Sequence, residues 1–160
     1  MMVLLVAAFV SNAACAQKIS ADKVPAAVSS AFKTKFPNAT KTVWEMEKAN
    51  EYEAGFKLNG EEITSCFDNT GAWIETETEI KVSSLPAAVQ AALSKDFAAY
   101  KIKEASKIES VKNGNSFEAE IKKGEETFDA LFTSDGKLLS KTKVETEKED
   151  KEDKEKGGKD

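Results

Sequence analysis

Two stretches of the chain carry apolar residues at the i, i+3, i+4 spacing of a helix with one buried face. The first set is Val24, Ala27, Val28, Ala31 and Phe32, and the second is Val89, Ala92 and Leu93. A proline comes at the start of each stretch, where its missing N–H costs nothing. The spacing predicts two short helices. The first ends before Pro37, because the residue before a proline is driven out of the helical region, and the second ends near residues 97–100.

Apolar and charged residues alternate after the first predicted helix, as in a strand of a sheet with one solvated face. The sequence then reads Asn59-Gly60, the strongest short signal for a hairpin with a two-residue loop. Such a loop pairs Leu58 with Glu61 and, further along, Tyr52 with Phe67. This register places the apolar residues of both strands on one face.

The same pattern recurs after the second predicted helix. A loop closed on Lys123-Gly124 pairs Ala119 with Phe128 and Phe117 with Ala130. Outer strands are expected at about 42–48, 72–80, 103–112 and 137–144. Each helix is therefore followed by four predicted antiparallel strands.

The two halves of this pattern are copies of one another. Residues 24–32 return as 85–93, 52–54 return as 117–119, and 67–71 return as 132–136, in the same order. Matches in one order indicate an internal repeat. We therefore predict an α+β fold of two tandem repeats, at 20–81 and 82–144, each with one helix packed on a four-stranded antiparallel sheet. The two sheets are expected either to pack together or to join into one.

The two ends of the chain differ from the repeats. Residues 1–16 are an apolar run that closes on small residues, Ala14-Cys15-Ala16, which is typical of a signal peptide cleaved before Gln17. The segment is too short to remain as a spanning helix, so no transmembrane segment is expected after cleavage. A lipid anchor on Cys15 and a buried N-terminal helix are alternatives. Residues 145–160 hold eight acids, five lysines and no apolar residue, which predicts a charged disordered tail.

The composition excludes several classes of function. All 23 basic residues are lysine, histidine is absent and the net charge is −5, so a nucleic-acid partner is not expected. Without histidine the chain lacks the commonest general base and metal ligand. The Asp-rich turns at 68–71 and 134–136 lack the ligand spacing of a calcium loop. Cys66 would be the one cysteine left after signal cleavage, so no internal disulfide is expected. We predict no enzyme activity, no cofactor and no metal site.

Aromatic and acidic side chains are the candidates for contact with a partner: Trp44, Trp73, Tyr52, Glu53 and Glu118. Tryptophan is common in binding hot spots, but both tryptophans also suit a packed core. The acids belong to the solvated face of the predicted sheet, which either is simply hydrated or recognises a basic partner.

The chain resembles the PepSY-like family of exported bacterial proteins, which is described as β-lactamase-inhibitor-like. The resemblance lies in the two helix openings at 24–28 and 85–89, the hairpins at 52–67 and 117–132, and the turns that end at Gly71 and Gly136. The junction Ala16-Gln17-Lys18 is similar to that of exported proteins of the Bacteroidetes. The resemblance implies a tandem repeat whose joined sheets offer a concave polar surface to a partner protein.

We therefore expect an exported, non-enzymatic protein, periplasmic or secreted, that binds another exported or envelope protein. Whether binding also restrains that partner stays open. The alternative is a binder of small molecules or envelope components, with a pocket between the repeats lined by Trp44, Tyr52 or Trp73. A purely structural envelope role is the third interpretation.

Overall fold

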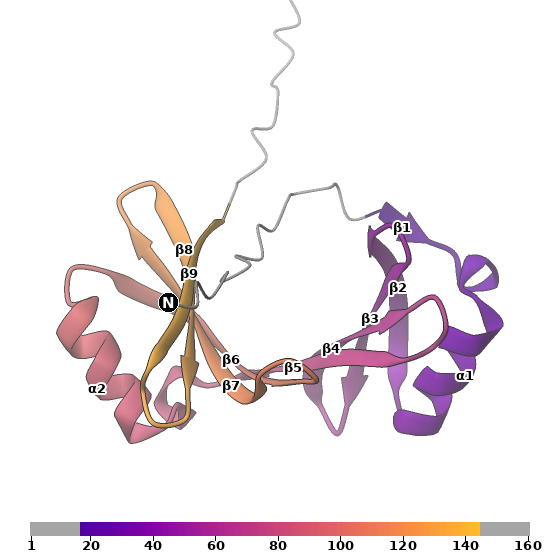
Figure 1. The fold of residues 1–160 in the computed structure, drawn as a ribbon, viewed down its shortest axis with the longest axis horizontal. Helices are drawn as coiled ribbons and strands as arrows, with labels where there is room; N and C mark the ends of the chain where they lie inside the picture. Colours follow the sequence, from indigo (N-terminus) through magenta and orange to yellow (C-terminus); the bar gives the residue numbers. More distant parts are fainter. Residues whose placement is uncertain (1–16, 145–160) are drawn as a thin grey trace, which may run out of the picture.

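The computed structural model describes residues 17–144, which form one antiparallel sheet with a helix at either end (Figure 1). The nine strands lie side by side in chain order. They are β1 Gln17–Ile19, β2 Thr40–Lys48, β3 Glu51–Leu58, β4 Glu61–Asp68, β5 Trp73–Ile80, β6 Lys101–Ser110, β7 Gly114–Lys123, β8 Glu126–Thr133 and β9 Leu138–Val144. The helices are α1 Ala26–Lys35 and α2 Ala87–Asp96, and single 3-10 turns precede them at Ala21–Lys23 and Val82–Ser84.

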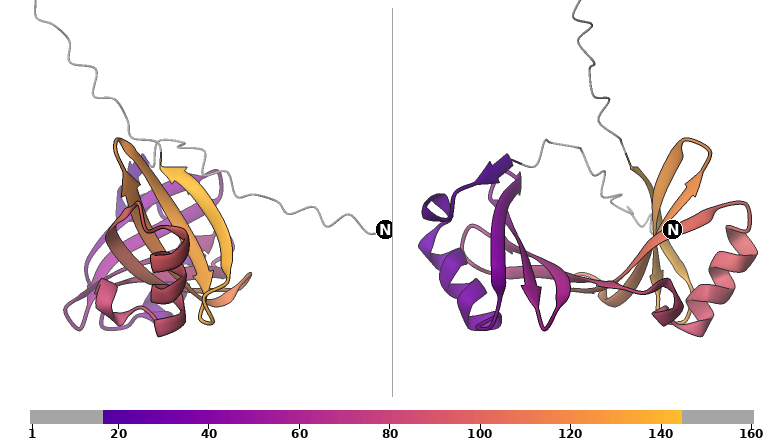
Figure 2. Two further views of the ribbon diagram at one scale, coloured as in Figure 1. Left: turned by 90° about the vertical axis from the view of Figure 1, so that its left-hand side faces the viewer. Right: turned by 180° about the vertical axis from the view of Figure 1, so that it is seen from behind.

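The predicted pair of helix-and-sheet repeats is confirmed, and the two sheets are joined edge to edge. Strand β5 of the first half pairs with β6 of the second, from Glu75 opposite Ser110 to Ile80 opposite Ala105. The helices lie on the outer side of the two halves, and the sheet bends between them into a saddle (Figures 1 and 2). The side of the sheet away from the helices is called the concave face below.

Each helix seals the core of its own half. In the first half α1 buries Val28 and Phe32 against the sheet. The centroid of the Phe32 ring lies 5.1 Å from that of Phe56 and 5.2 Å from that of Trp44, and both contacts are edge-on. Aromatic pairs favour this geometry. Trp44 is therefore a core residue, with 7% of its surface exposed.

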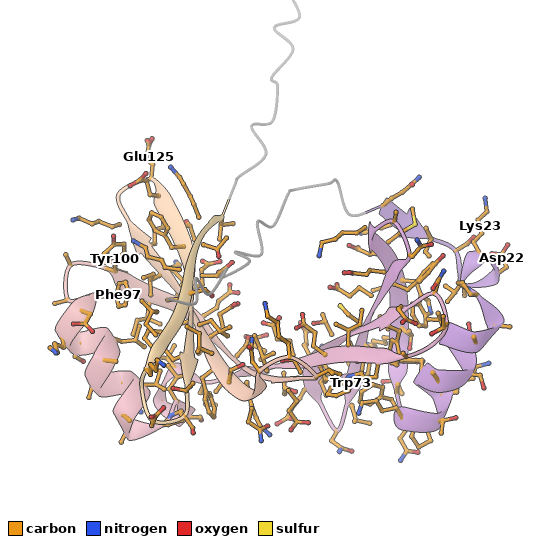
Figure 3. All side chains as sticks on the ribbon, viewed as in Figure 1. Asp22, Lys23, Trp73, Phe97, Tyr100 and Glu125 are labelled. Carbon is orange, nitrogen blue, oxygen red and sulfur yellow. The ribbon has the colours of Figure 1, made fainter. Side chains whose placement is uncertain are left out.

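The second core is built on smaller residues. Trp44 pairs with Ala54, whereas the matching pair in the second half is Ala105 and Ala119. An aromatic group at the end of α2 adds bulk, since Phe97 and Tyr100 pack beside β8 (Figure 3). Their ring centroids lie 5.7 Å apart.

The register of the first hairpin matches the prediction, with Leu58 opposite Glu61 and Tyr52 opposite Phe67. The loop residues Asn59 and Gly60 both take positive φ, 54° and 92°. Positive φ at both loop positions is what this tight turn requires.

The predicted register of the second hairpin is wrong by two residues. Ala119 lies opposite Ala130 rather than Phe128, and Phe117 lies opposite Phe132 rather than Ala130. The loop is Gly124-Glu125, with Glu125 at its tip (Figure 3). Gly124, at φ 63°, takes the first loop position, as glycine does in the mirror-image type II turn.

Strand β1 is not among the elements that the sequence predicts. It pairs with β2, from Gln17 opposite Met46 to Ile19 opposite Trp44. The predicted signal peptide and charged tail, 1–16 and 145–160, lie outside the described residues. Within residues 17–144, neither helix has the length and hydropathy needed to cross a bilayer.

Candidate binding surface on the concave face

The alternation of the strands decides which side chains reach the concave face. In β3, Ala54 and Phe56 belong to the core below α1, so the intervening Glu53, Gly55 and Lys57 point the other way. Cross-strand pairing extends these positions into rows that run through both halves.

Carboxylates dominate these rows. On the pairing registers, the acids on the concave face include Glu45, Glu53, Glu62, Glu75, Glu77, Glu79, Glu104, Glu118, Glu120 and Asp129. The lysines that join them on the first half include Lys41 and Lys57, and Lys57 forms a 2.7 Å ion pair with Glu62. The negative charge is therefore concentrated from β5 towards the second half.

Five of these acids line one small hollow of about 120 Å³: Glu77, Glu104, Glu118, Glu120 and Asp129. Burial, then the nearby charges of Glu77 and Asp129, raise the pKa of Glu118 to about 8. Burial, then the charge of Glu120, raise the pKa of Asp129 to about 6. Like charges held close in a poorly hydrated place disfavour ionisation. A positive charge brought into the hollow would therefore favour the ionised forms of Glu118 and Asp129.

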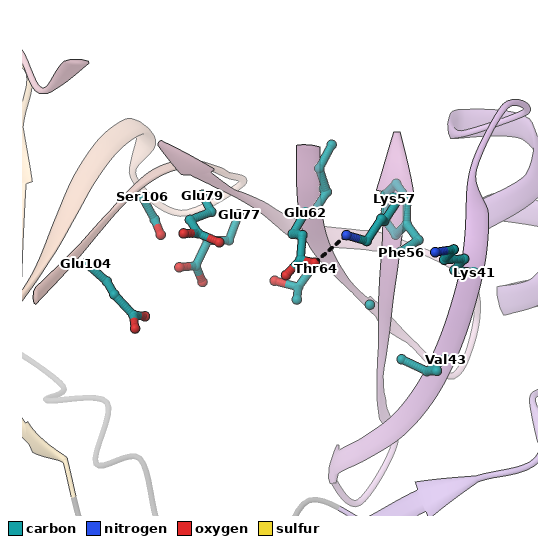
Figure 4. Close-up of a pocket in the computed structure, with 12 residues that line it drawn as sticks. Lys41, Val43, Phe56, Lys57, Glu62, Thr64, Glu77, Glu79, Glu104 and Ser106 are labelled. Carbon is teal, nitrogen blue, oxygen red and sulfur yellow. Dashed lines mark ion pairs between the residues drawn. The ribbon is translucent and has the colours of Figure 1, made fainter. Parts of the chain in front are cut away.

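An open groove of about 390 Å³ adjoins this hollow and crosses from the first half towards the second (Figure 4). Glu77, Glu104 and Ser106 line both cavities. Figure 4 shows Lys41 and Lys57 at the end of the groove remote from Glu104. The groove is thus polarised: Lys41 and Lys57, the latter ion-paired with Glu62, lie at one end, and the carboxylates that adjoin the hollow lie at the other.

The structure separates the five candidate residues between the two faces of the sheet. Glu53 and Glu118 both lie on the concave face, at equivalent positions of the two hairpins. Glu53 Oε2 lies 3.7 Å from the Cys66 Sγ. Trp44 is buried in the core of the first half, and Tyr52 and Trp73 pack partly buried against that core.

Trp73 is held in place by its neighbours. Its Nε1 donates to Thr76 Oγ1 at 2.9 Å, and the Lys35 ammonium lies 4.1 Å from the centre of its ring. The aromatics therefore line the α1 side, and the concave groove takes its lining from other residues.

The sequence predicts the position of some acids of the concave face. Glu77, Glu79 and Glu120 follow from the alternation of their strands. Glu104 does not, because an irregularity in the pairing of β6 between residues 102 and 104 shifts the phase of the strand. A β-bulge of this kind turns the next side chain to the opposite face, and no sequence signal marked it.

The Asp-rich turns are explained by their own hydrogen bonds. Asp68 Oδ1 accepts from the Thr70 hydroxyl at 2.6 Å and from the backbone N–H groups of Thr70 and Ala72, at 2.8 and 3.0 Å. These bonds lower the pKa of Asp68. In the matching turn, the Thr133 hydroxyl donates to Asp135. Across residues 17–144 no group of three or more acidic or cysteine side chains has the arrangement of a metal site.

Solved structures share the fold of this chain. A BLIP-like protein from Bacteroides fragilis is 27% identical, with a TM-score of 0.66 over 78% of this chain and 90% of that one. A protein from Bacteroides eggerthii, described as a putative periplasmic protein, is 22% identical, with a TM-score of 0.69 over 76% and 89%. No curated protein matches the chain significantly.

A family of sequences also matches, at residues 12–64 and 50–140, and its description reads "Putative beta-lactamase-inhibitor-like, PepSY-like". Together the two overlapping matches cover most of the chain, and the second runs from the first half into the second. This chain belongs to the PepSY-like family.

Proposed function

We propose that this chain is an exported, non-enzymatic protein that binds a basic surface of another periplasmic or envelope protein with its concave face and restrains it by covering that surface. The observation that carries the proposal is the crowding of carboxylates in the hollow around Glu118, where the pKa of one acid is raised to about 8. A lysine or arginine of a partner would relieve this repulsion on binding.

The electrostatics favour a protein partner with a basic patch. Carboxylates from several neighbouring strands act together on an approaching surface, and fields of one sign speed the encounter of complementary partners. Because such attraction between exposed charges is screened by salt, the complex is expected to weaken as ionic strength rises.

The comparisons support the same class of function. The Bacteroides fragilis protein with this fold is described as BLIP-like, and the family is described as inhibitor-like. The Bacteroides eggerthii protein is described as a putative periplasmic protein. We extend these descriptions to this chain as part of the proposal.

Site-specific photo-crosslinking in the envelope of the source organism tests the proposal. A photoreactive residue would replace Glu79 or Glu104, which are exposed on the concave face, or Lys33 or Lys95, which are exposed on the helices. We expect one exported protein to be crosslinked from the two concave positions and not from the helices. Crosslinking from the helices alone, or from no position, would refute the proposal.

A charge-neutralising pair separates specific contact from general acidity. Glu79→Gln with Glu104→Gln removes two charges from the concave face, and the control Asp22→Asn with Asp96→Asn removes two exposed charges elsewhere. We expect the first pair to weaken the crosslink and the second to leave it intact. An activity assay on the captured partner, with and without this protein, then measures restraint.

A further inference from the structure

The concave face carries two sites at equivalent positions of the repeat, of which one is uncharged and the other is acidic. Each consists of three cross-strand neighbours at matching positions of the two halves. In the first half the row is Val43, Gly55 and Thr64, and in the second it is Glu104, Glu120 and Asp129. The first row lies in the groove and the second lines the carboxylate hollow beside it.

The first row forms a shallow depression over Val43 and Gly55, which is called the apolar seat below. Val43 is 56% exposed although it is aliphatic. Gly55 sits inside a strand, and its φ lies outside the left-handed region, so the backbone there does not require glycine. A Cβ at this position would lie 3.3 Å from Val43 Cγ2. A glycine inside a strand often marks a place where another chain approaches the backbone closely.

A pairing irregularity between Thr40 and Val43 shapes the end of this seat. Lys41, in between, has a φ of 55°, which is uncommon for a residue other than glycine. Such departures cost free energy and gather at functional sites. Lys41 lines the groove with Lys57, away from Glu104 (Figure 4). A basic side chain of a partner is therefore less favoured at this end, where Lys57 is already paired with Glu62, than among the carboxylates at the other end.

We propose that the groove receives an extended segment of the partner protein that places an aliphatic side chain over Val43 and Gly55 and a lysine or arginine in the carboxylate hollow beside Glu104 and Glu120. This inference rests on the proposed function, because it assigns the chemistry of the partner at that face. It adds a specificity rule: the partner is recognised by one apolar and one basic side chain, at a spacing fixed by the separation of the two rows in the groove and the hollow.

Synthetic peptides are the probe. Peptides of about eight residues, acetylated and amidated, would carry one leucine and one arginine separated by a varied number of serines, and would be titrated into the full ¹⁵N-labelled chain. We expect one spacing to shift the amide resonances of Gly55 and Glu120 together. Replacing the leucine by serine, or the arginine by glutamate, should each weaken binding about tenfold.

Variants of the protein test the two sites separately. Val43→Ser removes the two exposed methyl groups of Val43, and Gly55→Leu fills the space above Gly55. Each should reduce peptide affinity about tenfold, while the preference for arginine over glutamate in the peptide stays as it is in the parent chain. Val43→Ser changes only a surface side chain, so it keeps the test open if Gly55→Leu does not fold. Glu104→Gln with Glu120→Gln should remove the preference for arginine over glutamate.

The proposal is overturned if no spacing shifts both sites, or if Val43→Ser and the Glu104/Glu120 pair bind every peptide as the parent chain does. The outcomes separate from those of the proposed function. If a partner is crosslinked and Val43→Ser does not reduce the yield of that crosslink, the proposed function stands and this inference is refuted. If the peptides bind in the groove but no protein is crosslinked, the proposed function is refuted and the chemistry assigned to the groove stands.

Discussion

Gly136 lies directly against the backbone of Ala88, so that a Cβ on Gly136 would be 2.5 Å from the Ala88 carbonyl oxygen. The first half repeats this contact, with a Cβ on Gly71 placed 2.7 Å from the Ala27 carbonyl oxygen. In each half the turn that leads into the last strand is thus pressed on the first turns of the helix. Both glycines also have positive φ, 84° and 85°, so the repeat conserves a backbone contact as well as a sequence pattern.

Alanine at these glycines should destabilise the fold through steric conflict. Gly71→Ala adds a Cβ that must push the Ala27 carbonyl away, and we expect the free energy of unfolding to fall by about 3 kcal/mol or more. Gly60→Ala is the matched control, because Gly60 has a φ of 92° and open space around its Cα. It should cost about 1 kcal/mol. Equal losses in urea unfolding would show that the contact with α1 has no energetic effect.

The carboxylate hollow makes stability depend on pH. The pKa of Glu118 is raised from 4.5 to about 8 in the folded chain, so the folded state keeps a proton that the unfolded state releases in this window. The free energy of unfolding should therefore fall as pH rises from about 4.5 to 8 and level off above. Asp129, raised from 3.8 to about 6, adds the same trend at lower pH.

Glu118→Gln isolates this effect. The variant should be more stable than the parent at about pH 9, by on the order of 2 kcal/mol, and nearly equal to it at about pH 4, where both side chains are uncharged. Glu125→Gln makes the same charge change at the exposed tip of the β7–β8 hairpin and should leave the pH profile unchanged. A parent profile that is flat from about pH 5 to 8 would contradict the account.

A buried polar network beside Trp73 should contribute to stability. The Thr76 hydroxyl contacts Trp73 Nε1 and the Ser65 hydroxyl, each at 2.9 Å. Thr76→Val leaves the Trp73 Nε1–H without its acceptor, whereas the Ser65 hydroxyl keeps its bond to the Glu75 carbonyl. We expect a loss of about 1–3 kcal/mol in the free energy of unfolding.

Ser116 provides the contrast to Thr76. Its hydroxyl is buried and has no hydrogen-bond partner among residues 17–144. Ser116→Ala should therefore change stability by less than about 0.5 kcal/mol, or increase it. A loss as large as that of Thr76→Val would mean that the Ser116 hydroxyl is satisfied by bound water.

Tryptophan emission should report the core position of Trp44. In a Trp73→Phe variant the remaining Trp44 is 7% exposed and packs on Phe32, so its emission should be blue-shifted and poorly quenched by acrylamide. A Trp44→Phe variant, which keeps the partly buried Trp73, should be quenched more readily. Quenching of Trp44 as strong as that of free tryptophan would place it at the surface and restore it as a partner anchor.

The candidate surface was only partly predictable. Alternation in β3 and β7 predicts that Glu53 and Glu118 share the solvated face of the sheet, and both lie on the concave face. The aromatic candidates could not be assigned in this way, because a tryptophan suits a core and an interface equally well. Only the packing of α1 on β2 resolved Trp44 as a core residue.

The sequence by itself determined both helices, every strand but β1, and the repeat, because proline positions, helical spacing and the Asn59-Gly60 loop act locally on the backbone. It did not determine the second hairpin: a slip of two residues leaves every side chain on the same face, and Gly124 fits either loop position. The tertiary structure decided three further features: the joining of the two sheets through β5 and β6, the shift in phase before Glu104, and the gathering of acids from several strands into one hollow. Each depends on contacts between residues distant in the chain, which no local pattern specifies.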